Sequence, residues 1–345
     1  MDIPPAHHSQ LILVAIPARN EAETIGDVIS AIPGNRFPGY RLETVVFDDA
    51  SVDGTAERAS RAGAAVRRVD RPRGLGGFFR AAVQEALERG ADILVNIDGD
   101  GQFDPGEIPE LVDPIIADRA DFVAGDRFSG QTVRPPDMSR VKYVGNQWMT
   151  SLISRITGLG IRDASSGFRA YSREALLNVN LQSRFTYTQE TFLDLAVKGV
   201  RIAQVPVTVR YFPERRSRIA RSIPRYAFWT LTTIFRTVRD HRPLRTFGTA
   251  ALILFVAGGA LAGFVLWHYL TTGAFSPYIF LMLTSAYLLT VGLIVSIVGI
   301  ASDMLAPIRR NQETLVYLAR RTAYGGPRQQ EPADTSTRDA GSQRP

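Results

Sequence analysis

Two long runs without a charged residue, 247–269 and 278–302, constrain this chain more than any other feature of its sequence. At about 1.5 Å of rise per residue, a helix of either length spans the roughly 30 Å hydrocarbon core of a bilayer. The linker of residues 271–277 is short and uncharged, so we expect a hairpin of two transmembrane helices. The alternative is a pair of buried core helices, but a soluble protein of 345 residues rarely contains two such runs.

Positive charge is concentrated just before the first of these runs. Residues 201–245, called here the basic segment, contain eleven Arg, no Lys and two acidic residues, a net charge of +9. The whole chain carries +6, so the remainder carries −3, which argues against a nucleic-acid partner. Arginines also follow the hairpin, and the positive-inside rule then places both flanks in the cytoplasm. The basic segment mixes Arg with aromatic residues, which is also typical of an amphipathic helix at a membrane surface.

Short apolar runs alternate with segments of helical periodicity in the N-terminal part of the chain. This alternation predicts an α/β protein with a mostly parallel sheet covered on both faces. In such sheets ligands bind beyond the carboxyl ends of the strands. The predicted strands are 11–16, 44–47, 64–69, 93–97, 122–124 and 202–209, and the predicted helices are 21–32, 53–62, 76–89 and 107–117.

Polar clusters follow four of the predicted strands. They are P-A-R-N-E at 17–21, D-D-A-S-V-D-G-T at 48–55, D-G-D-G-Q at 98–102 and G-D-R-F at 125–128. Any one of them is compatible with ordinary turn chemistry. Four of them at corresponding strand ends indicate a binding site.

The third cluster offers only hard oxygen ligands. Asp98 and Asp100 lie one residue apart, and the amide of Gln102 follows. Such a set suits Mg²⁺ or Mn²⁺ bound together with the phosphates of a substrate. The Gly-rich basic stretch 71–77 is a second, weaker candidate for contact with phosphates.

The composition excludes several other kinds of site. The chain has no Cys, which removes disulfides, Cys-ligated zinc, iron–sulfur clusters and a cysteine nucleophile. Its four His lie outside the predicted sheet region. Residues 1–10 are polar and do not resemble a signal peptide, so we expect the N-terminal body to stay in the cytoplasm.

In this order, the motifs P-x-x-N-E, D-D-x-S-x-D-G-T, D-x-D-x-Q and S-G-F-R-A resemble those of family 2 glycosyltransferases. The likeness covers about residues 11–245 and is strongest to dolichol- or polyprenyl-phosphate hexose synthases of the dolichol-phosphate mannose synthase type. It implies a GT-A fold, which is Rossmann-like, followed by interfacial helices and the two-helix hairpin.

The resemblance and the charge pattern together divide the chain into six parts. Residues 11–218 form the predicted GT-A domain and 219–245 a basic amphipathic juxtamembrane segment. The hairpin occupies 246–303, and residues 304–324 form a basic cytoplasmic helix. We expect residues 1–10 and 325–345 to be disordered.

The resemblance also implies roles for individual residues on the donor side. A nucleotide-sugar site is implied for Pro17, Arg19, Glu21, Asp48 and Asp49 around the base and ribose, and for Asp98, Asp100 and Gln102 around the metal. Arg210 and Arg218 are candidates for the donor phosphates. Two positions depart from the family pattern, because Arg218 stands where Lys is usual and Arg19 where an aromatic residue is common.

On the acceptor side the resemblance implies a second set. Arg127 matches an Arg near the acceptor phosphate, and Ser166 and Arg169 belong to the loop beside the sugar. Asp163 precedes that loop and is the candidate for a general base. Arg140 and Lys142 are the available cations where the mannose synthases offer Arg and Ser, and we expect Glu190 to touch the sugar or the acceptor.

The predicted reaction is metal-dependent, inverting transfer of a hexose from a GDP- or UDP-sugar to a polyprenyl phosphate at a cell membrane. Because a phosphate monoester is largely ionised above its second pKa of about 6, it needs no general base. A glycan acceptor would need one, Asp163 being the candidate. The alternatives are therefore a polysaccharide-type glycosyltransferase and a non-catalytic scaffold tethered to the membrane. The donor sugar and association into homo-oligomers are left open.

Overall fold

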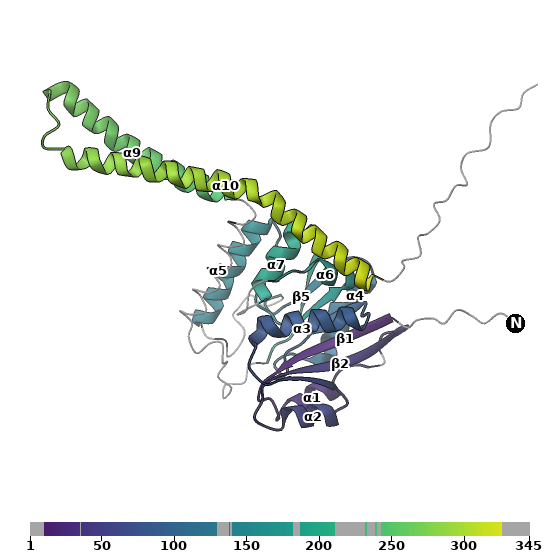
Figure 1. Cartoon of the computed structure of the whole chain (residues 1–345). Helices are drawn as coiled ribbons and strands as arrows, with labels where there is room; N and C mark the ends of the chain where they lie inside the picture. The colour runs from purple at the N-terminus through teal and green to yellow at the C-terminus, as the bar shows by residue number, and fades with distance from the viewer. Residues whose placement is uncertain are drawn as a thin grey trace, which may run out of the picture.

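The computed structural model describes residues 10–34, 36–129, 138, 140–181, 187–210, 232, 239 and 243–325, and of Lys142 it describes the main chain alone (Figure 1). Most of the basic segment, including Arg218, therefore lies outside the described residues. So do residues 1–9 and 326–345, which include almost all of the two termini predicted to be disordered.

A seven-stranded sheet forms the centre of the N-terminal domain. Its strands lie in the order β3-β2-β1-β4-β6-β5-β7, and all neighbours pair in parallel except at β6, which is antiparallel to both β4 and β5. The predicted mostly parallel α/β sheet is thus confirmed. The strands are β1 (Gln10–Ala18), β2 (Tyr40–Asp49), β3 (Ala65–Val69), β4 (Ile93–Asn96), β5 (Phe122–Asp126), β6 (Arg169–Ser172) and β7 (Ile202–Pro206).

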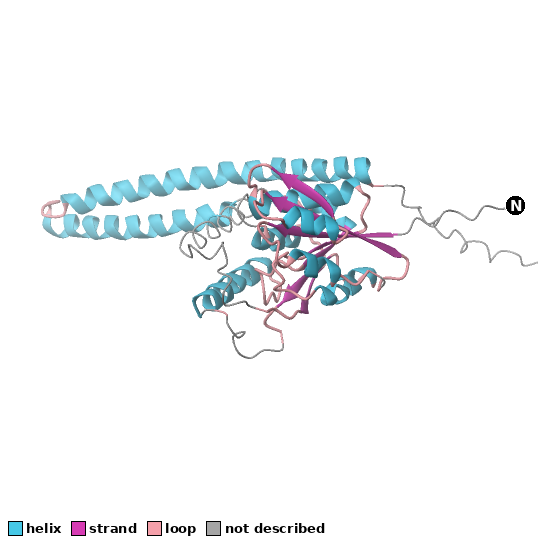
Figure 2. Cartoon of the chain, turned by 90° about the horizontal axis from the view of Figure 1, so that it is seen from below, coloured by secondary structure: helices cyan, strands magenta, loops and turns pink. Residues whose placement is uncertain are grey.

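Helices cover both faces of the sheet, which explains why the central strands read as continuous apolar runs. In β1, Leu11 and Leu13 point into one core and Ile12 and Val14 into the other. Figure 2 shows helices on either side of the strands. One core contains residues of α1 (Ile25–Ser30), α2 (Thr55–Arg61) and α4 (Ile108–Ile116), which continues the short helix η1 (Pro105–Glu107). The other contains residues of α3 (Gly74–Glu88), α5 (Arg140–Thr157), α6 (Arg173–Asn178) and α7 (Thr188–Val197).

Strand β6 differs from the sequence interpretation, which treated 166–170 as a loop. Arg169 and Ala170 lie in β6, where they pair with Asn96 and Val95 of β4. The strand has four residues and begins with a charged side chain, so its sequence carries no apolar run that would reveal it. Its position between β4 and β5 brings the S-G-F-R-A motif next to the acidic cluster.

The two apolar runs form long helices, α9 (Pro243–Thr272) and α10 (Ile279–Tyr324), which lie side by side (Figures 1 and 2). Both are long and apolar enough to cross a membrane. Small residues bring them close: the hydroxyl of Ser285 donates to the carbonyl of Gly258 at 2.9 Å, and Gly292 packs on Phe255. The predicted basic helix 304–324 is part of α10, so the second apolar run and this segment form one helix of 46 residues.

This packing predicts that Gly258→Ala destabilises the hairpin. A Cβ at this position would lie 3.0 Å from Cγ of Leu289 and 3.2 Å from Cβ of Leu288, so these side chains must shift to make room for it. Overpacking of this kind costs about 1 to 3 kcal/mol, and we expect a lower midpoint of thermal unfolding in detergent. Gly259→Ala is the matched control, because a Cβ at Gly259 meets nothing within 4 Å. Equal midpoints for the two variants would contradict the described packing.

Candidate active site

The loops that follow β1 and β2 are fastened to each other by their own polar side chains. The backbone N–H of Asn20 donates to Oγ of Ser51 at 2.9 Å, and Oδ1 of Asn20 accepts the N–H of Val52 at 2.9 Å. The N–H of Glu21 donates to Oγ1 of Thr55 at 2.9 Å. Asn20 itself has a positive φ of 53°. Several residues of the two motifs thus build the site's frame, a role that sequence reasoning did not assign to them.

The two adjacent acids at the end of β2 have different surroundings. Both oxygens of Asp49 accept backbone N–H groups, from Arg73 at 2.6 Å and Gly74 at 3.2 Å, so this carboxylate caps α3. Asp48 is buried, and its Oδ1 accepts the N–H of Ser51 at 3.0 Å. No described residue donates a hydrogen bond to its Oδ2, although Nε of Arg68 lies 3.5 Å away. A buried acceptor without a donor is costly unless a ligand supplies one.

The acidic loop after β4 is held in a tight turn. Gly101 has a φ of +74°, which residues with a side chain rarely adopt. The N–H of Gln102 donates to Oδ1 of Asp100 at 3.0 Å. The hydroxyl of Thr24 donates to the carbonyl of Gly99 at 2.9 Å, which ties this turn to the loop after β1. Asp98 and Asp100 are thereby fixed at the carboxyl edge of the sheet.

The two carboxylates act on each other electrostatically. Burial and the negative charges of Asp100 and Glu21 raise the pKa of Asp98 to about 7, against the opposing charges of Arg127 and Arg169. A carboxylate pair of this kind fits a divalent cation, which restores the charged form of both groups. Among the described residues, however, no group of three or more His, Asp and Glu side chains converges on one point. A cation here would therefore take further ligands from a substrate or water.

The S-G-F-R-A motif lies directly against this acidic pair. A Cβ built on Gly167 would stand 2.7 Å from Oδ2 of Asp98, closer than real side chains approach. A side chain at position 167 would therefore displace the carboxylate of Asp98, and this close approach, not a positive φ, accounts for the glycine.

The Arg–Asp pair formed by Arg127 and Asp163 is almost fully buried. Nε of Arg127 donates to Oδ2 of Asp163 at 2.6 Å, and Nη2 donates to Oδ1 at 3.0 Å and to Oγ of Ser165 at 2.7 Å. Burial alone would raise the pKa of Asp163, but the charge and hydrogen bonds of Arg127 outweigh it and lower the pKa. Asp163 therefore stays ionised and paired, which favours a role in orienting Arg127 over the predicted role as a base.

Arg169 is also enclosed by protein atoms. Its guanidinium donates to the carbonyls of Ser166, Thr188 and Ala164 at 2.7, 2.8 and 3.1 Å. It also lies 5.0 Å from the ring centre of Phe192. Arg169 and Ser166 have no exposed surface, so the structure favours a part in shaping the loop over the predicted contact with sugar or acceptor.

Arg210 is held beside the acidic loop by the main chain. After β7 the chain forms a bridge between Phe103 and Val209, and the N–H of Arg210 donates to the carbonyl of Gln102 at 2.8 Å. The exposed side chain of Arg210 thus starts next to the candidate metal ligands.

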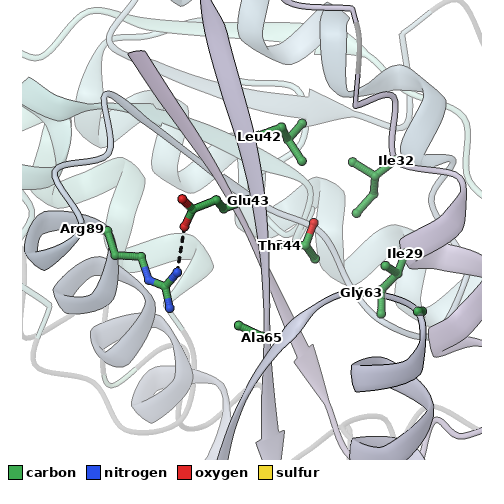
Figure 3. A pocket seen from close by; sticks show the side chains of 9 residues that line it. Ile29, Ile32, Leu42, Glu43, Thr44, Gly63, Ala65 and Arg89 are labelled. Carbon is green, nitrogen blue, oxygen red and sulfur yellow. Dashed lines mark hydrogen bonds and ion pairs between the residues drawn. The ribbon is translucent and has the colours of Figure 1, made fainter. Parts of the chain in front are cut away.

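The cavity drawn in Figure 3 lies elsewhere. It has a volume of about 350 Å³ and is lined by the first half of β2, including Leu42 and Thr44, and by the ion pair of Glu43 with Arg89. Since Asp48 ends the same strand, this cavity is at the opposite edge of the sheet from the polar loops.

Comparison with known proteins assigns the family. Residues 13–179 match the model of glycosyl transferase family 2. The glycosyltransferase AglJ of Haloferax volcanii is 30% identical over 303 residues, which cover 87% of this chain and 95% of that protein. The chain belongs to glycosyl transferase family 2.

Two further comparisons agree with this assignment. The undecaprenyl-phosphate mannosyltransferase of Micrococcus luteus is 32% identical over 214 residues, which cover 57% of this chain and 82% of that protein. The crystal structure of glucosyl-3-phosphoglycerate synthase from Mycobacterium tuberculosis with phosphoglyceric acid is 25% identical, with a TM-score of 0.53, and the match covers 66% of this chain and 80% of that one. The predicted GT-A fold is confirmed.

The structure also describes the positions of four further residues that were predicted to belong to the site. Pro17 is half-buried in β1, where its carbonyl accepts the N–H of Gly99 at 3.3 Å, and Arg19 is exposed directly after the strand. Glu190 lies in the first turn of α7, and Arg140 is exposed at the start of α5. The predicted roles of Arg218 and the Lys142 side chain fall outside the described residues.

The buried Arg–Asp pair predicts a loss of stability in Asp163→Asn. Removing one charge leaves the guanidinium buried without its counter-ion, which costs about 3 to 5 kcal/mol at neutral pH. Because the pKa of Asp163 is lowered from 3.8, this contribution is complete above that value and fades as the pH falls through the folded-state pKa. Denaturant unfolding of both proteins between neutral and acidic pH measures it.

Asp118→Asn is the matched control, because it removes a carboxylate from an exposed pair with Arg201 at 2.6 Å. We expect a change below about 1 kcal/mol at every pH. Equal losses of unfolding free energy in the two variants would show that burial of the Arg127–Asp163 pair does not increase its contribution to stability.

Proposed function

We propose that this protein transfers a hexose from a nucleotide-diphosphate sugar to a polyprenyl phosphate at the cytoplasmic face of a cell membrane. The observation that carries the proposal is the pair of carboxylates, Asp98 and Asp100, held in a tight turn at the carboxyl edge of the sheet in a chain that also has two membrane-length helices. The relative from Micrococcus luteus, an undecaprenyl-phosphate mannosyltransferase, supports the class of acceptor.

The carboxylates give the donor site its chemistry. Asp98, Asp100 and Gln102 would hold Mg²⁺ or Mn²⁺, which supplies charge stabilisation to the departing diphosphate. Arg210, and in the proposal Arg218, add positive charge on the same side. Hydrogen bonds from the base fit Asp48, because its buried Oδ2 lacks a donor among the described residues. Pro17, Arg19 and Glu21 would line the rest of the nucleoside.

On the acceptor side Arg127 is the best-placed cation. Its charge acts on Asp98, and the hydrogen bond to Asp163 fixes its side chain. The side chain is therefore ordered before substrate binds, and binding does not have to supply the free energy for ordering it. An oxygen of the acceptor phosphate attacks the anomeric carbon, the bond to the nucleoside diphosphate breaks, and the configuration inverts. No proton needs to be removed, which agrees with an Asp163 whose two oxygens accept hydrogen bonds from Arg127. Arg140, Lys142 and Glu190 are the further acceptor or sugar contacts we propose.

The non-catalytic scaffold is the less favoured alternative. A scaffold has no need of two carboxylates one residue apart, and the negative charge of Asp100 disfavours the ionised form of Asp98 by raising its pKa. A glycan acceptor with a hydroxyl nucleophile is also less favoured, since its proposed base is already committed to Arg127.

The proposal predicts transfer to lipid in membranes that contain the full chain. Labelled GDP-mannose, UDP-glucose and UDP-N-acetylhexosamine are offered in turn with a polyprenyl phosphate and Mn²⁺ or Mg²⁺. One of them should yield a labelled product that extracts into organic solvent. Failure of every donor would contradict the proposal, and product on a soluble glycan alone would favour the alternative acceptor.

The carboxylate pair predicts that Asp100→Asn lowers turnover by about 100-fold or more. The fold should persist, because Asn keeps the side-chain oxygen that accepts the N–H of Gln102, and the thermal midpoint without metal should change little. Asp104→Asn is the control, since Asp104 is exposed and, among the described residues, its carboxylate accepts the N–H of Gly106 at 2.8 Å. Undiminished turnover in Asp100→Asn would remove this residue from the proposed metal site.

A further inference from the structure

The C-terminal part of α10 presents a single face to the catalytic domain. From residue 302 onward, its partly buried residues recur at intervals of three and four, while those between them are exposed. This is the spacing of one helical face. The last four members, called here the docking face, are Glu313, Tyr317, Arg320 and Tyr324.

Specific hydrogen bonds join the docking face to α6. The hydroxyl of Tyr317 donates to Oε1 of Glu174 at 2.9 Å, and Nη1 of Arg320 donates to the carbonyl of Val179 at 2.6 Å. The carbonyl of Tyr324 accepts a hydrogen bond from Arg173. The rings of Tyr317 and Tyr324 also pack against the apolar core. This is a built contact between distant parts of the chain rather than a chance approach.

The contact lies at the edge of the sheet opposite to the candidate active site. The N–H of Arg173 donates to the carbonyl of Asp92, and the N–H of Leu11 donates to Oδ2 of Asp92, at the amino ends of β4 and β1. Asp98 follows the carboxyl end of β4. In Figure 1 the end of α10 lies on the side where the chain enters β1, and the hairpin projects beyond α5 on the other side. The helix therefore runs past the whole domain.

The length of the helix matches this path. From Ser302, the last residue of the uncharged run, to Tyr324 an α-helix rises about 33 Å. The nine residues of β1 extend over about 30 Å. Anchoring at the amino edge thus turns the carboxyl edge, with its acidic loop, toward the part of α10 that would lie in the bilayer.

The structure assigns to Tyr317 and Arg320 a positioning role: they dock α10 on α6 and so hold the active-site edge against the membrane, within reach of a phosphate carried by a membrane-embedded lipid. This inference rests on the proposed lipid-phosphate acceptor. On this inference, loss of the docking face lowers the turnover of an acceptor confined to the bilayer. It leaves unchanged the turnover of an acceptor that diffuses to the site from water.

The test compares two acceptors with full-length protein in liposomes. One is a long-chain polyprenyl phosphate in the bilayer, and the other is a short, water-soluble prenyl phosphate. In the double variant Tyr317→Phe/Arg320→Ala, we expect turnover of the bilayer acceptor to fall by about tenfold or more because the phosphate is misplaced, and turnover of the soluble one to stay within about twofold. Arg310→Ala is the matched control, since it removes an exposed Arg of α10 outside the docking face.

Equal losses with both acceptors would reduce the docking face to a stabilising contact, and no loss with either would also overturn the inference. A wild-type protein that uses neither acceptor would contradict the proposed function instead. In that case docking is measured separately, because a chain without Cys permits spin labels at Glu88→Cys and Ala323→Cys. The double variant should broaden the distance distribution between the labels, and an unchanged distribution would overturn the inference.

Discussion

Parallel pairing of β1 with both β2 and β4 is the constraint on which the rest of the molecule depends. Since all three strands run in one direction, the loops that follow them meet at a single edge. Three of the four polar motifs are brought together by this pairing alone. Strand β6, inserted in the opposite direction, then places Gly167 against Asp98. The position of the active site is thus a property of strand order more than of any one loop.

The sequence predicts this architecture well, because a strand that is buried on both faces is apolar at every position and is therefore visible as a short continuous apolar run. β1 and β4 are of this kind, and both were predicted close to their observed bounds. β6 could not be predicted, since four residues that begin with Arg169 show neither alternation nor an apolar run. The continuity of α10 across residue 303 was equally hidden, because a change from apolar to basic composition does not end a helix.

The candidate site shows a different limit. Sequence motifs identify which polar residues gather at the edge, but they do not distinguish those that face a ligand from those that hold one another. Asp48 and Asp49 are neighbours, and yet the first has a buried oxygen to which no residue in the described ranges donates, while the second caps α3. Asp163 and Arg127 lie 36 positions apart, and only the fold shows that they neutralise each other. Partner identity depends on tertiary distance, which a single sequence does not contain.

The docked helix α10 also restricts how this chain can change in length. Each residue inserted between its uncharged run and Glu313 would rotate the docking face by about 100° and advance it by about 1.5 Å. Insertions of one or two residues would therefore turn Tyr317 and Arg320 away from α6, while seven residues, close to two full turns, would restore the face but shift it by about 10 Å. Elsewhere on the surface a loop can absorb such changes. The docking contact therefore fixes both the number of residues and the helical phase of the part of α10 between the uncharged run and Glu313.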